Sequence, residues 1–201
     1  ISAGQTFKLM DAPHGKVSHL RRLGLAAMRQ GKVGAVLLAG GANLRFQGSN
    51  PPIGCTRSLL QIPSGKSIVQ LCCERIRRIV ELCRAPGETS EQRKHPLSIP
   101  VFVMTSKLTH KAVVAHFESN RYFGLLPRDV TFFEQPVYPA LDDYGRLLPQ
   151  SLGGEFAHAP GGTGDVIGAL ANSSALEQMR DRGVECLHIV GIENALARVC
   201  D

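Results

Sequence analysis

Four short apolar runs, separated by segments of helical periodicity, most constrain how this chain can fold. The runs are Val33–Leu38, Ile99–Ser106, Val130–Gln135 and Cys186–Ile192. The first two are continuous, which is typical of strands buried on both faces of a sheet. Helical spacing of apolar residues occurs in Val17–Gln30, Ser67–Cys83, His110–Ser119 and Asp165–Arg182. Strands that alternate with helices predict an α/β fold, with a mainly parallel sheet and helices on both of its faces.

Local signals give finer predictions for the helices and turns. Gly31 is expected to end the first helix. The sequence LDDYGRLL, residues 141–148, predicts a turn flanked by two short strands. The helix over 67–83 is expected to bury one stripe of side chains, formed by Ile68, Leu71, Cys72, Ile76, Ile79 and Leu82.

The composition is typical of a soluble globular protein with one domain. The 201 residues are 43% hydrophobic and 20% charged, which allows a sizeable core. No apolar run reaches the roughly 18 residues of a membrane span, so a membrane is not an expected partner. The N-terminus lacks the pattern of a signal peptide, and the missing first methionine leads us to expect a fragment.

Charge and cysteine content limit the expected partners and compartment. The net charge of +6 suits anionic ligands. The basic residues are scattered along the chain, so nucleic acid is not an expected partner. The six cysteines include no C-x-x-C pair, and no histidine pair has zinc-finger spacing. We therefore expect reduced thiols in a cytoplasmic protein.

Polar residues follow each of the four predicted strands. In open parallel sheets, ligands bind beyond the carboxyl ends of the strands. The residues expected at that edge are Gly40 and Gly41 with Arg45, then Thr105–Ser106, Glu134–Gln135 and Glu193–Asn194.

The glycine pair matches neither of two common phosphate-binding motifs. The stretch IPSGKS has Leu60 where a P-loop needs its first glycine, and AGGANLR lacks the spacing of a dinucleotide loop. Adjacent glycines still let backbone N–H groups approach a ligand, and the following Arg45 can bind phosphate. On the residues alone, a phosphate-binding loop and a plain tight turn both remain open.

Six segments, spread from about residue 20 to the end of the chain, resemble the eukaryotic UDP-N-acetylhexosamine pyrophosphorylases. In order they are GLAAMRQGKVGAVLLAGG, IPSGKSIVQLCCERI, IPVFVMTS, FESNRYFGLLPRDVTFFEQ, HAPGGTGDVIGAL and MRDRGVECLHIVGIENALARV. The resemblance implies a Rossmann-like, GT-A-like nucleotidyltransferase sheet, truncated at the C-terminus. It also implies a reaction of UTP with an N-acetylhexosamine 1-phosphate that gives the UDP-sugar and pyrophosphate, with Mg²⁺. Residues 1–32 would then be an N-terminal helical segment, and 33–201 the nucleotide-binding part.

The resemblance assigns phosphate contacts to the loop after the first strand. Gly40 and Gly41 match the family's glycine pair as nucleotide-binding residues, and Arg45 matches its catalytic arginine. Ile53 stands where the family has a phosphate-contacting lysine. Lys66, in PSGKS, is the remaining lysine with an expected catalytic role at the phosphates.

The later segments supply the expected base, sugar and metal contacts. Gln135 matches the family's uracil-reading glutamine, and Gly162 its uridine-contacting glycine. Thr163 takes the place of the sugar-contacting asparagine, and Asn194 is the other expected sugar-binding residue. Glu193 stands for the aspartate that faces the metal and phosphates, and its extra methylene moves the carboxylate by about 1.5 Å.

Three functions are open at this point. The first is a UDP-N-acetylglucosamine diphosphorylase represented by its N-terminal and central part. The second is a UDP-glucose or UDP-sugar pyrophosphorylase, because GTGDV at 162–166 resembles those relatives. The third is a non-catalytic remnant that binds nucleotide or serves as an interaction module, as Ile53 and Thr163 would suggest.

Overall fold

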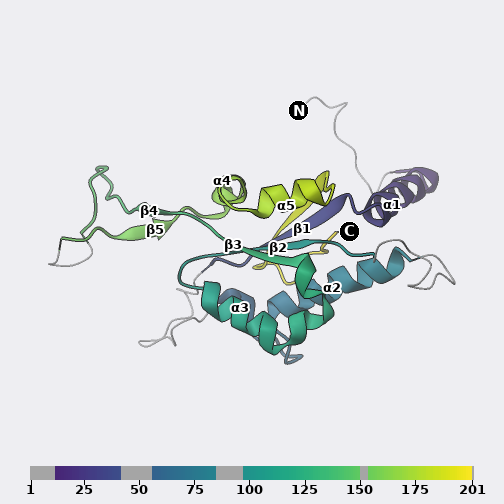
Figure 1. Cartoon of the computed structure of the whole chain (residues 1–201), viewed down its shortest axis with the longest axis horizontal. Helices are drawn as coiled ribbons and strands as arrows, with labels where there is room; N and C mark the ends of the chain where they lie inside the picture. The colour runs from purple at the N-terminus through teal and green to yellow at the C-terminus, as the bar shows by residue number, and fades with distance from the viewer. Residues whose placement is uncertain (1–11, 42–55, 85–96, 150–153, 201) are drawn as a thin grey trace.

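Four parallel strands form the central sheet of the computed structural model, which describes residues 12–41, 56–84, 97–149 and 154–200 (Figure 1). The strands are β1 (Val33–Leu38), β2 (Val101–Thr105), β3 (Val130–Glu134) and β6 (Cys186–Gly191). Their order in the sheet is β3-β2-β1-β6, and every neighbouring pair is parallel. The predicted α/β fold with a parallel sheet is therefore confirmed.

The apolar runs occupy the two central strands because both faces of these strands are covered. Every residue of β2 is buried, as are the four central residues of β1. Alternate side chains enter two separate cores: Leu37 and Val103 lie on one face, and Val36 and Phe102 on the other. Strand β6 pairs only with β1 among the described strands.

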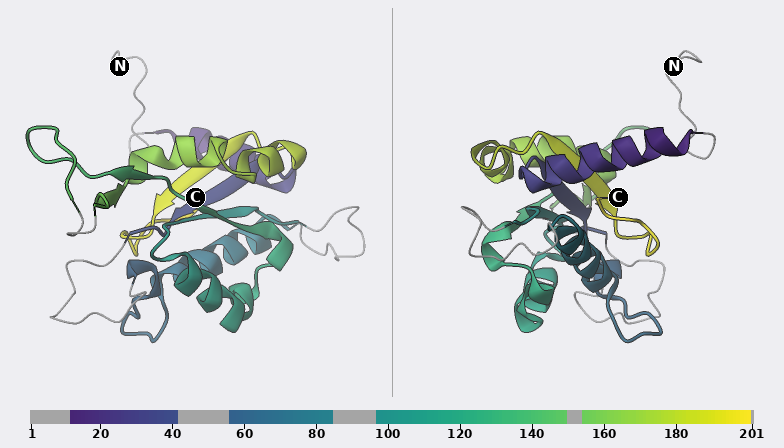
Figure 2. Two further views of the ribbon diagram at one scale, coloured as in Figure 1. Left: turned by 60° about the vertical axis from the view of Figure 1, so that its left-hand side comes forward. Right: turned by 90° about the vertical axis from the view of Figure 1, so that its right-hand side faces the viewer.

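Helices cover both faces of the sheet, as the sequence predicted (Figure 2). Helices α2 (Ile68–Leu82) and α3 (His110–Ser119) lie on one face, and α4 (Val166–Ala171) and α5 (Ala175–Asp181) on the other. Helix α1 (His14–Arg29) buries none of its residues and ends before Gly31, whose φ is +74°. No helix in the described part of the chain is long and apolar enough to cross a membrane. Single 3-10 turns are η4 (Arg57–Leu59), η6 (Arg121–Gly124), η7 (Pro127–Asp129) and η8 (Thr163–Asp165).

The buried stripe of α2 differs from the predicted one. Val69 and Cys73 are buried together with Cys72 and Ile76, whereas Leu82 is 44% exposed. Cys83, which directly follows the helix, is again buried, and Ile79 and Val80 pack against the same core, so the buried face is wider than the predicted stripe and Leu82 lies outside it. Burial raises the pKa of the Cys73 thiol, so this thiol is a small apolar core group.

The single helix predicted over 165–182 is wrong. Two helices, α4 and α5, are separated at Asn172–Ser174. The hydroxyl of Ser173 donates to the carbonyl of Leu170 at 3.2 Å and accepts from the amide of Ala175 at 3.3 Å. Such side-chain bonds to the backbone compete with the helical bonds and end the first helix.

A two-stranded arm projects from the edge of the sheet where its strands end (Figure 1). It consists of β4 (Val137–Pro139) and β5 (His158–Pro160), which pair antiparallel. Further out, Leu141 and Leu147 form an isolated bridge around the predicted turn. One carboxylate oxygen of Asp142 accepts two backbone N–H groups there, each at 2.9 Å, which confirms the turn at 141–148.

A hydrogen bond between Ser67 and His116 joins the start of α2 to α3. The Ser67 hydroxyl caps α2 by accepting the Gln70 amide, and it lies 2.9 Å from Nε2 of His116. Desolvation lowers the pKa of His116 below its usual 6.5. The unfolded chain therefore binds a proton at His116 more readily than the folded chain does.

We predict that folding stability falls as the pH drops below about 6.5, with His116 as one cause. Between the usual pKa and the lowered folded pKa, the unfolded state holds the extra proton, so stability rises with pH there. His116→Gln keeps a polar group near Ser67 but cannot titrate, so it should flatten this part of the curve. Urea unfolding from pH 5 to 8 measures the effect, with the exposed His14→Gln as control. An unchanged pH profile in His116→Gln would contradict the assignment.

Candidate functional site

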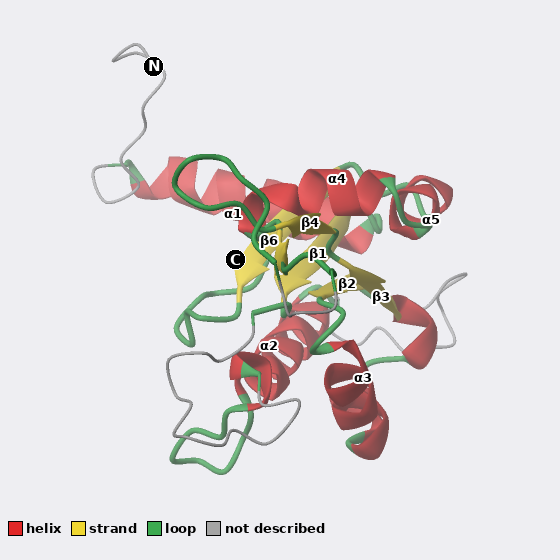
Figure 3. Ribbon diagram, turned by 90° about the vertical axis from the view of Figure 1, so that its left-hand side faces the viewer, coloured by secondary structure: helices red, strands yellow, loops and turns green. Residues whose placement is uncertain are grey.

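Four of the predicted ligand-binding residues, Gly40, Gly41, Gln135 and Glu193, follow strands at the carboxyl end of the sheet, which faces the viewer in Figure 3. Strand β1 leads there to Gly40 and Gly41, and β3 to Gln135. Strand β6 leads to Glu193 at the other side of β1. The parallel order of the strands thus brings together residues that are up to about 150 positions apart in the sequence.

Gly40 lies directly against the amide of Gln135. A Cβ atom at Gly40 would be 2.8 Å from Nε2 of Gln135 and 3.2 Å from the carbonyl carbon of Thr105. A side chain at this position would have to displace the Gln135 amide and press on the Thr105 backbone, so the close approach favours glycine. Gln135 is 6% exposed, and its backbone N–H donates to the Thr105 carbonyl at 2.8 Å. The β1 loop and the end of β3 therefore meet across the end of β2.

Gly41 lies beside Glu193, and its carbonyl accepts a hydrogen bond from a buried threonine hydroxyl. The Thr56 hydroxyl donates to the Gly41 carbonyl at 3.2 Å and lies 2.9 Å from the hydroxyl of Ser58. A Cβ atom at Gly41 would be 3.8 Å from Oε1 of Glu193. The glycine pair is thus next to an amide on one side and a carboxylate on the other.

The β4–β5 ladder connects Gln135 to the second glycine segment. The N–H of Gly161 donates to the carbonyl of Pro136 at 3.2 Å, and Val137 pairs with Pro160. Gly162 follows with φ +82°, a conformation that favours glycine. The hydrogen bond between Gly161 and Pro136 thus joins the residue before Gly162 to the residue after Gln135. Gly162 and Gln135 are the two expected uridine contacts.

Lys66 is engaged by an acidic residue of α2. Its Nζ lies 2.7 Å from Oε2 of Glu74, whose other oxygen accepts from Gln70 at 2.9 Å. The Lys66 hydrogen bond is the main cause that lowers the pKa of Glu74. Lys66 lies on a turn that Ile62 closes by donating its N–H to the Lys66 carbonyl at 3.0 Å. The charge expected at the phosphates is thus partly compensated by Glu74.

The two expected sugar contacts, Thr163 and Asn194, are both exposed. Thr163 opens the η8 turn directly after Gly162. The side-chain oxygen of Asn194 accepts the N–H of Leu196 at 3.0 Å, so part of its hydrogen-bonding capacity holds the turn after β6. Arg45, Asn43, Leu44 and Ile53 lie outside the described residues, and their expected roles remain predictions.

His110 is a polar residue of this edge that the sequence did not single out. Its Nδ1 lies 2.9 Å from the hydroxyl of Thr105 and 3.5 Å from a carboxylate oxygen of Glu134. The Thr105 hydroxyl also donates to the carbonyl of Phe133 at 3.2 Å. This group ties the first turn of α3 to the residues just before Gln135. Thr105 and Glu134, the last residues of β2 and β3, were expected at this edge, but nothing in the sequence near His110 indicated that it contacts them.

Glu193 is the acidic group beside the glycine pair that a divalent cation could use. No cluster of three His, Cys, Asp or Glu side chains occurs within the described ranges. The Glu193 carboxylate lies within 4 Å of the Cβ positions of both Gly41 and Gly191. Because Mg²⁺ is commonly held by one or two carboxylates plus substrate phosphates, this donor set fits a metal that arrives with its nucleotide.

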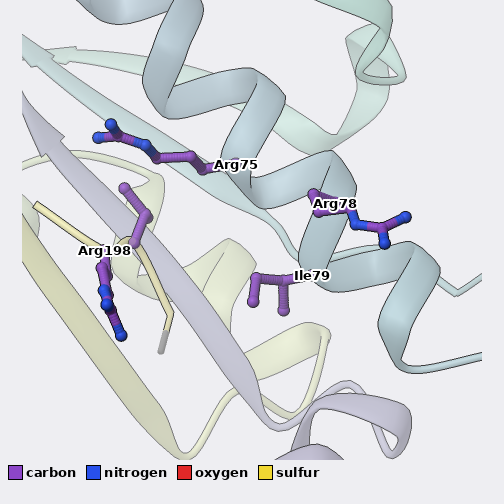
Figure 4. A pocket seen from close by; sticks show the side chains of 5 residues that line it. Arg75, Arg78, Ile79 and Arg198 are labelled. Atoms are coloured by element: carbon purple, nitrogen blue, oxygen red, sulfur yellow. The ribbon is translucent and has the colours of Figure 1, made fainter. Parts of the chain in front are cut away.

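A pocket of about 210 Å³ lies away from the glycine pair, between α2 and the segment after β6 (Figure 4). Arg75, Arg78, Ile79, Arg198 and Val199 line it. Arg75 donates to the carbonyl of Ala197 at 2.8 Å, and Arg78 pairs with Glu81. The three guanidinium groups point in different directions in Figure 4, so they do not form a common anion site.

Comparison with known proteins assigns the chain to a family. Residues 15–201 match the family described as UTP–glucose-1-phosphate uridylyltransferase. UDP-N-acetylglucosamine diphosphorylase 2 of Arabidopsis thaliana is 40% identical over 184 residues, which are 90% of this chain and 35% of that protein. The probable UDP-N-acetylglucosamine pyrophosphorylase of Schizosaccharomyces pombe is 36% identical over 180 residues. The chain spans about a third of the length of these relatives.

Solved structures agree with this assignment. The uridine diphosphate N-acetylglucosamine pyrophosphorylase of Trypanosoma brucei has a TM-score of 0.80 at 28% identity, over 99% of this chain and 40% of that one. UDP-glucose pyrophosphorylase of Leishmania major has a TM-score of 0.59 at 18% identity, over 84% of this chain and 32% of that one, which shows the fold alone. The chain belongs to the UTP–glucose-1-phosphate uridylyltransferase family.

Proposed function

We propose that this chain is the nucleotide-binding part of a uridylyltransferase that forms UDP-N-acetylglucosamine and pyrophosphate from UTP and N-acetylglucosamine 1-phosphate. The observation that carries the proposal is the contact of Gly40 with the Gln135 amide at the carboxyl end of the sheet. The names of relatives that are 31–40% identical support this sugar. In this proposal residues 33–201 form the nucleotide-binding part and 1–32 an N-terminal helical segment.

The base is read by Gln135 and the glycine segment of the arm. The side-chain amide of Gln135 offers both a donor and an acceptor, which matches the carbonyl and imino edge of uracil. Gly162 is the second proposed base contact, and the Gly161–Pro136 hydrogen bond joins its neighbour to the residue after Gln135. Gly40 packs against the Gln135 amide without adding a side chain, and Gln135 is 6% exposed.

The phosphates bind on the side of the glycine pair that faces away from Gln135. The sugar phosphate oxygen attacks the α-phosphorus of UTP in line with the departing pyrophosphate. The protein's part is to position the reactants and to stabilise charge. Backbone N–H groups at Gly40 and Gly41, together with Arg45 and Lys66, are the proposed phosphate contacts. Thr163 and Asn194 are the proposed contacts of the sugar.

The proposed cofactor is Mg²⁺, with Glu193 as its protein ligand. Bound there, Mg²⁺ would neutralise part of the triphosphate charge. Glu193 itself is placed by the turn after β6, where the N–H of Asn194 donates to the carbonyl of Gly191 at 3.2 Å. The five described cysteines, of which four are buried, are free thiols, which supports a reducing, cytoplasmic compartment.

We expect UTP to bind more tightly than ATP, and Gln135→Glu to remove this preference. The glutamate keeps the shape of the side chain but replaces the amide donor with a second acceptor. A lost hydrogen bond in a buried site costs about 1–3 kcal/mol, or roughly 10–100-fold in affinity. Calorimetry with both nucleotides measures it, and the exposed Gln30→Glu is the matched control. Equal affinities for UTP and ATP in the unmodified chain would reject the proposed base reading.

We expect Mg²⁺ to tighten UTP binding, and Glu193→Gln to remove most of that gain. The amide is nearly the same size but carries no charge for the metal. Titration of UTP with and without Mg²⁺ gives the ratio for each variant, and Glu177→Gln on the exposed face of α5 is the control. If Glu193→Gln retains the full Mg²⁺ effect, Glu193 is not the ligand.

The isolated chain is expected to turn over slowly. Ile53 replaces one lysine, and Glu74 compensates Lys66. Loss of one charge-stabilising donor commonly costs about 10²–10³ in rate. Pyrophosphate release from UTP, Mg²⁺ and either N-acetylglucosamine 1-phosphate or glucose 1-phosphate is the assay, with the sugar phosphate omitted as control. Turnover near 1 per second, within the ordinary range of enzymes, would contradict the expected deficiency.

The same assay separates the alternatives. Preference for glucose 1-phosphate would favour a UDP-glucose pyrophosphorylase, which the GTGDV segment resembles. Tight UTP binding without turnover, even after a lysine is restored by Ile53→Lys, would favour a nucleotide-binding remnant.

A further inference from the structure

A carboxylate is packed beneath the glycine segment of the arm. Asp165 lies at the end of the η8 turn, and its backbone N–H donates to the Gly162 carbonyl at 3.3 Å. Its Oδ1 accepts a hydrogen bond from the Tyr138 hydroxyl at 3.3 Å. Tyr138 belongs to β4, so this bond joins the glycine segment to the opposite strand of the arm.

The carboxylate fills the space that a side chain at residue 161 would need. A Cβ atom on Gly161 would lie 1.5 Å from Oδ2 of Asp165 and 2.6 Å from Cε2 of Tyr138. The backbone of Gly161 therefore rests on both side chains. On its other side, the Gly161 N–H is bound to the Pro136 carbonyl. Movement of Asp165 or Tyr138 would move Gly161 and, with it, Gly162.

The other oxygen of Asp165 is buried. Oδ2 has no hydrogen-bond partner among the described residues, so the Tyr138 hydroxyl is an important stabilising contact for this carboxylate. Partial desolvation and the bond to Asp165 raise the pKa of Tyr138, as expected for a hydroxyl that keeps its proton and donates it. Without the Tyr138 hydroxyl, the Asp165 carboxylate would lose this hydrogen bond. Its exposure to water would then be favoured over its position beneath Gly161.

We propose that Tyr138 and Asp165 are positioning residues that set the distance between Gln135 and Gly162, and thereby the discrimination between uracil and other pyrimidines. Both act through Gly161 and do not touch the nucleotide. This inference rests on the proposed function, because it assumes that Gln135 and Gly162 frame the base. The ligand class is a uridine nucleotide, with cytidine nucleotides as the rejected competitor, since cytosine presents a donor where uracil presents an acceptor.

The test is the ratio of the affinities of UMP and CMP for the chain, measured by calorimetry. Tyr138→Phe should lower this ratio about tenfold, because a shift of the loop weakens the hydrogen bonds that distinguish the two bases. Tyr144→Phe is the matched control: Tyr144 lies on the same arm and is 83% exposed, and its ratio should stay that of the unmodified chain. A purely structural defect would weaken both nucleotides equally and leave the ratio unchanged.

Substitutions of Asp165 test the positioning role independently, by the same ratio of affinities. Asp165→Asn retains an acceptor for the Tyr138 hydroxyl and should keep the ratio within about threefold, whereas Asp165→Ala should lower it as Tyr138→Phe does. The double variant Tyr138→Phe/Asp165→Ala should lose no more than either single variant, because one contact is removed in all three.

The experiment distinguishes failure of the positioning role from failure of the proposed function. If the unmodified chain prefers UMP but Tyr138→Phe and Asp165→Ala keep its ratio, the positioning role is overturned and the proposed function stands. If the unmodified chain shows no preference for UMP, the proposed function fails, and the positioning role fails with it. Additive effects in the double variant would also overturn the role of the Tyr138–Asp165 contact.

Discussion

The close contact between the Gly40 backbone and the Gln135 amide is the constraint around which the site is arranged. It favours a glycine at the end of β1, because a Cβ atom would lie 2.8 Å from Nε2 of Gln135 and 3.2 Å from the carbonyl carbon of Thr105. It also requires that β2 end between the two, where the Thr105 carbonyl accepts the Gln135 N–H. The parallel order β3-β2-β1 supplies both conditions, so the fold and the site depend on the same pairing of strands.

From this contact the site extends in two directions with different chemistry. Toward the arm, backbone hydrogen bonds and the Tyr138–Asp165 pair fix a surface suited to a neutral base. Toward β6, Gly41 and Glu193 form a surface suited to phosphates and a cation. In the proposed function, the base and the phosphates therefore bind on opposite sides of one glycine pair, with the nucleotide oriented along the edge of the sheet.

The sequence predicted the elements that depend on burial. Continuous apolar runs predicted β1 and β2, because a strand covered on both faces has few polar positions. The partly exposed strands β3 and β6 were predicted from apolar runs that polar residues interrupt. The glycine pair and Gln135 could be placed because both directly follow such strands. The helix break at Ser173 was missed because apolar residues keep helical spacing over the 18 residues from 165 to 182, whether or not a serine hydroxyl interrupts the helix. The Lys66–Glu74 pair and the place of Asp165 beneath Gly161 depend on tertiary contacts that no local pattern specifies.

The central claim is that the carboxyl edge of this sheet binds a uridine nucleotide between Gly40, Gln135 and Gly162. Backbone amide NMR spectra of the isotope-labelled chain, recorded during a titration with UMP, test it most directly. The account predicts that the largest shifts occur at these three residues and that Gly31 and Gly183, at positive φ in turns elsewhere, stay unchanged. Shifts that spread evenly over the chain, or that centre on the pocket beside Arg75, would contradict it.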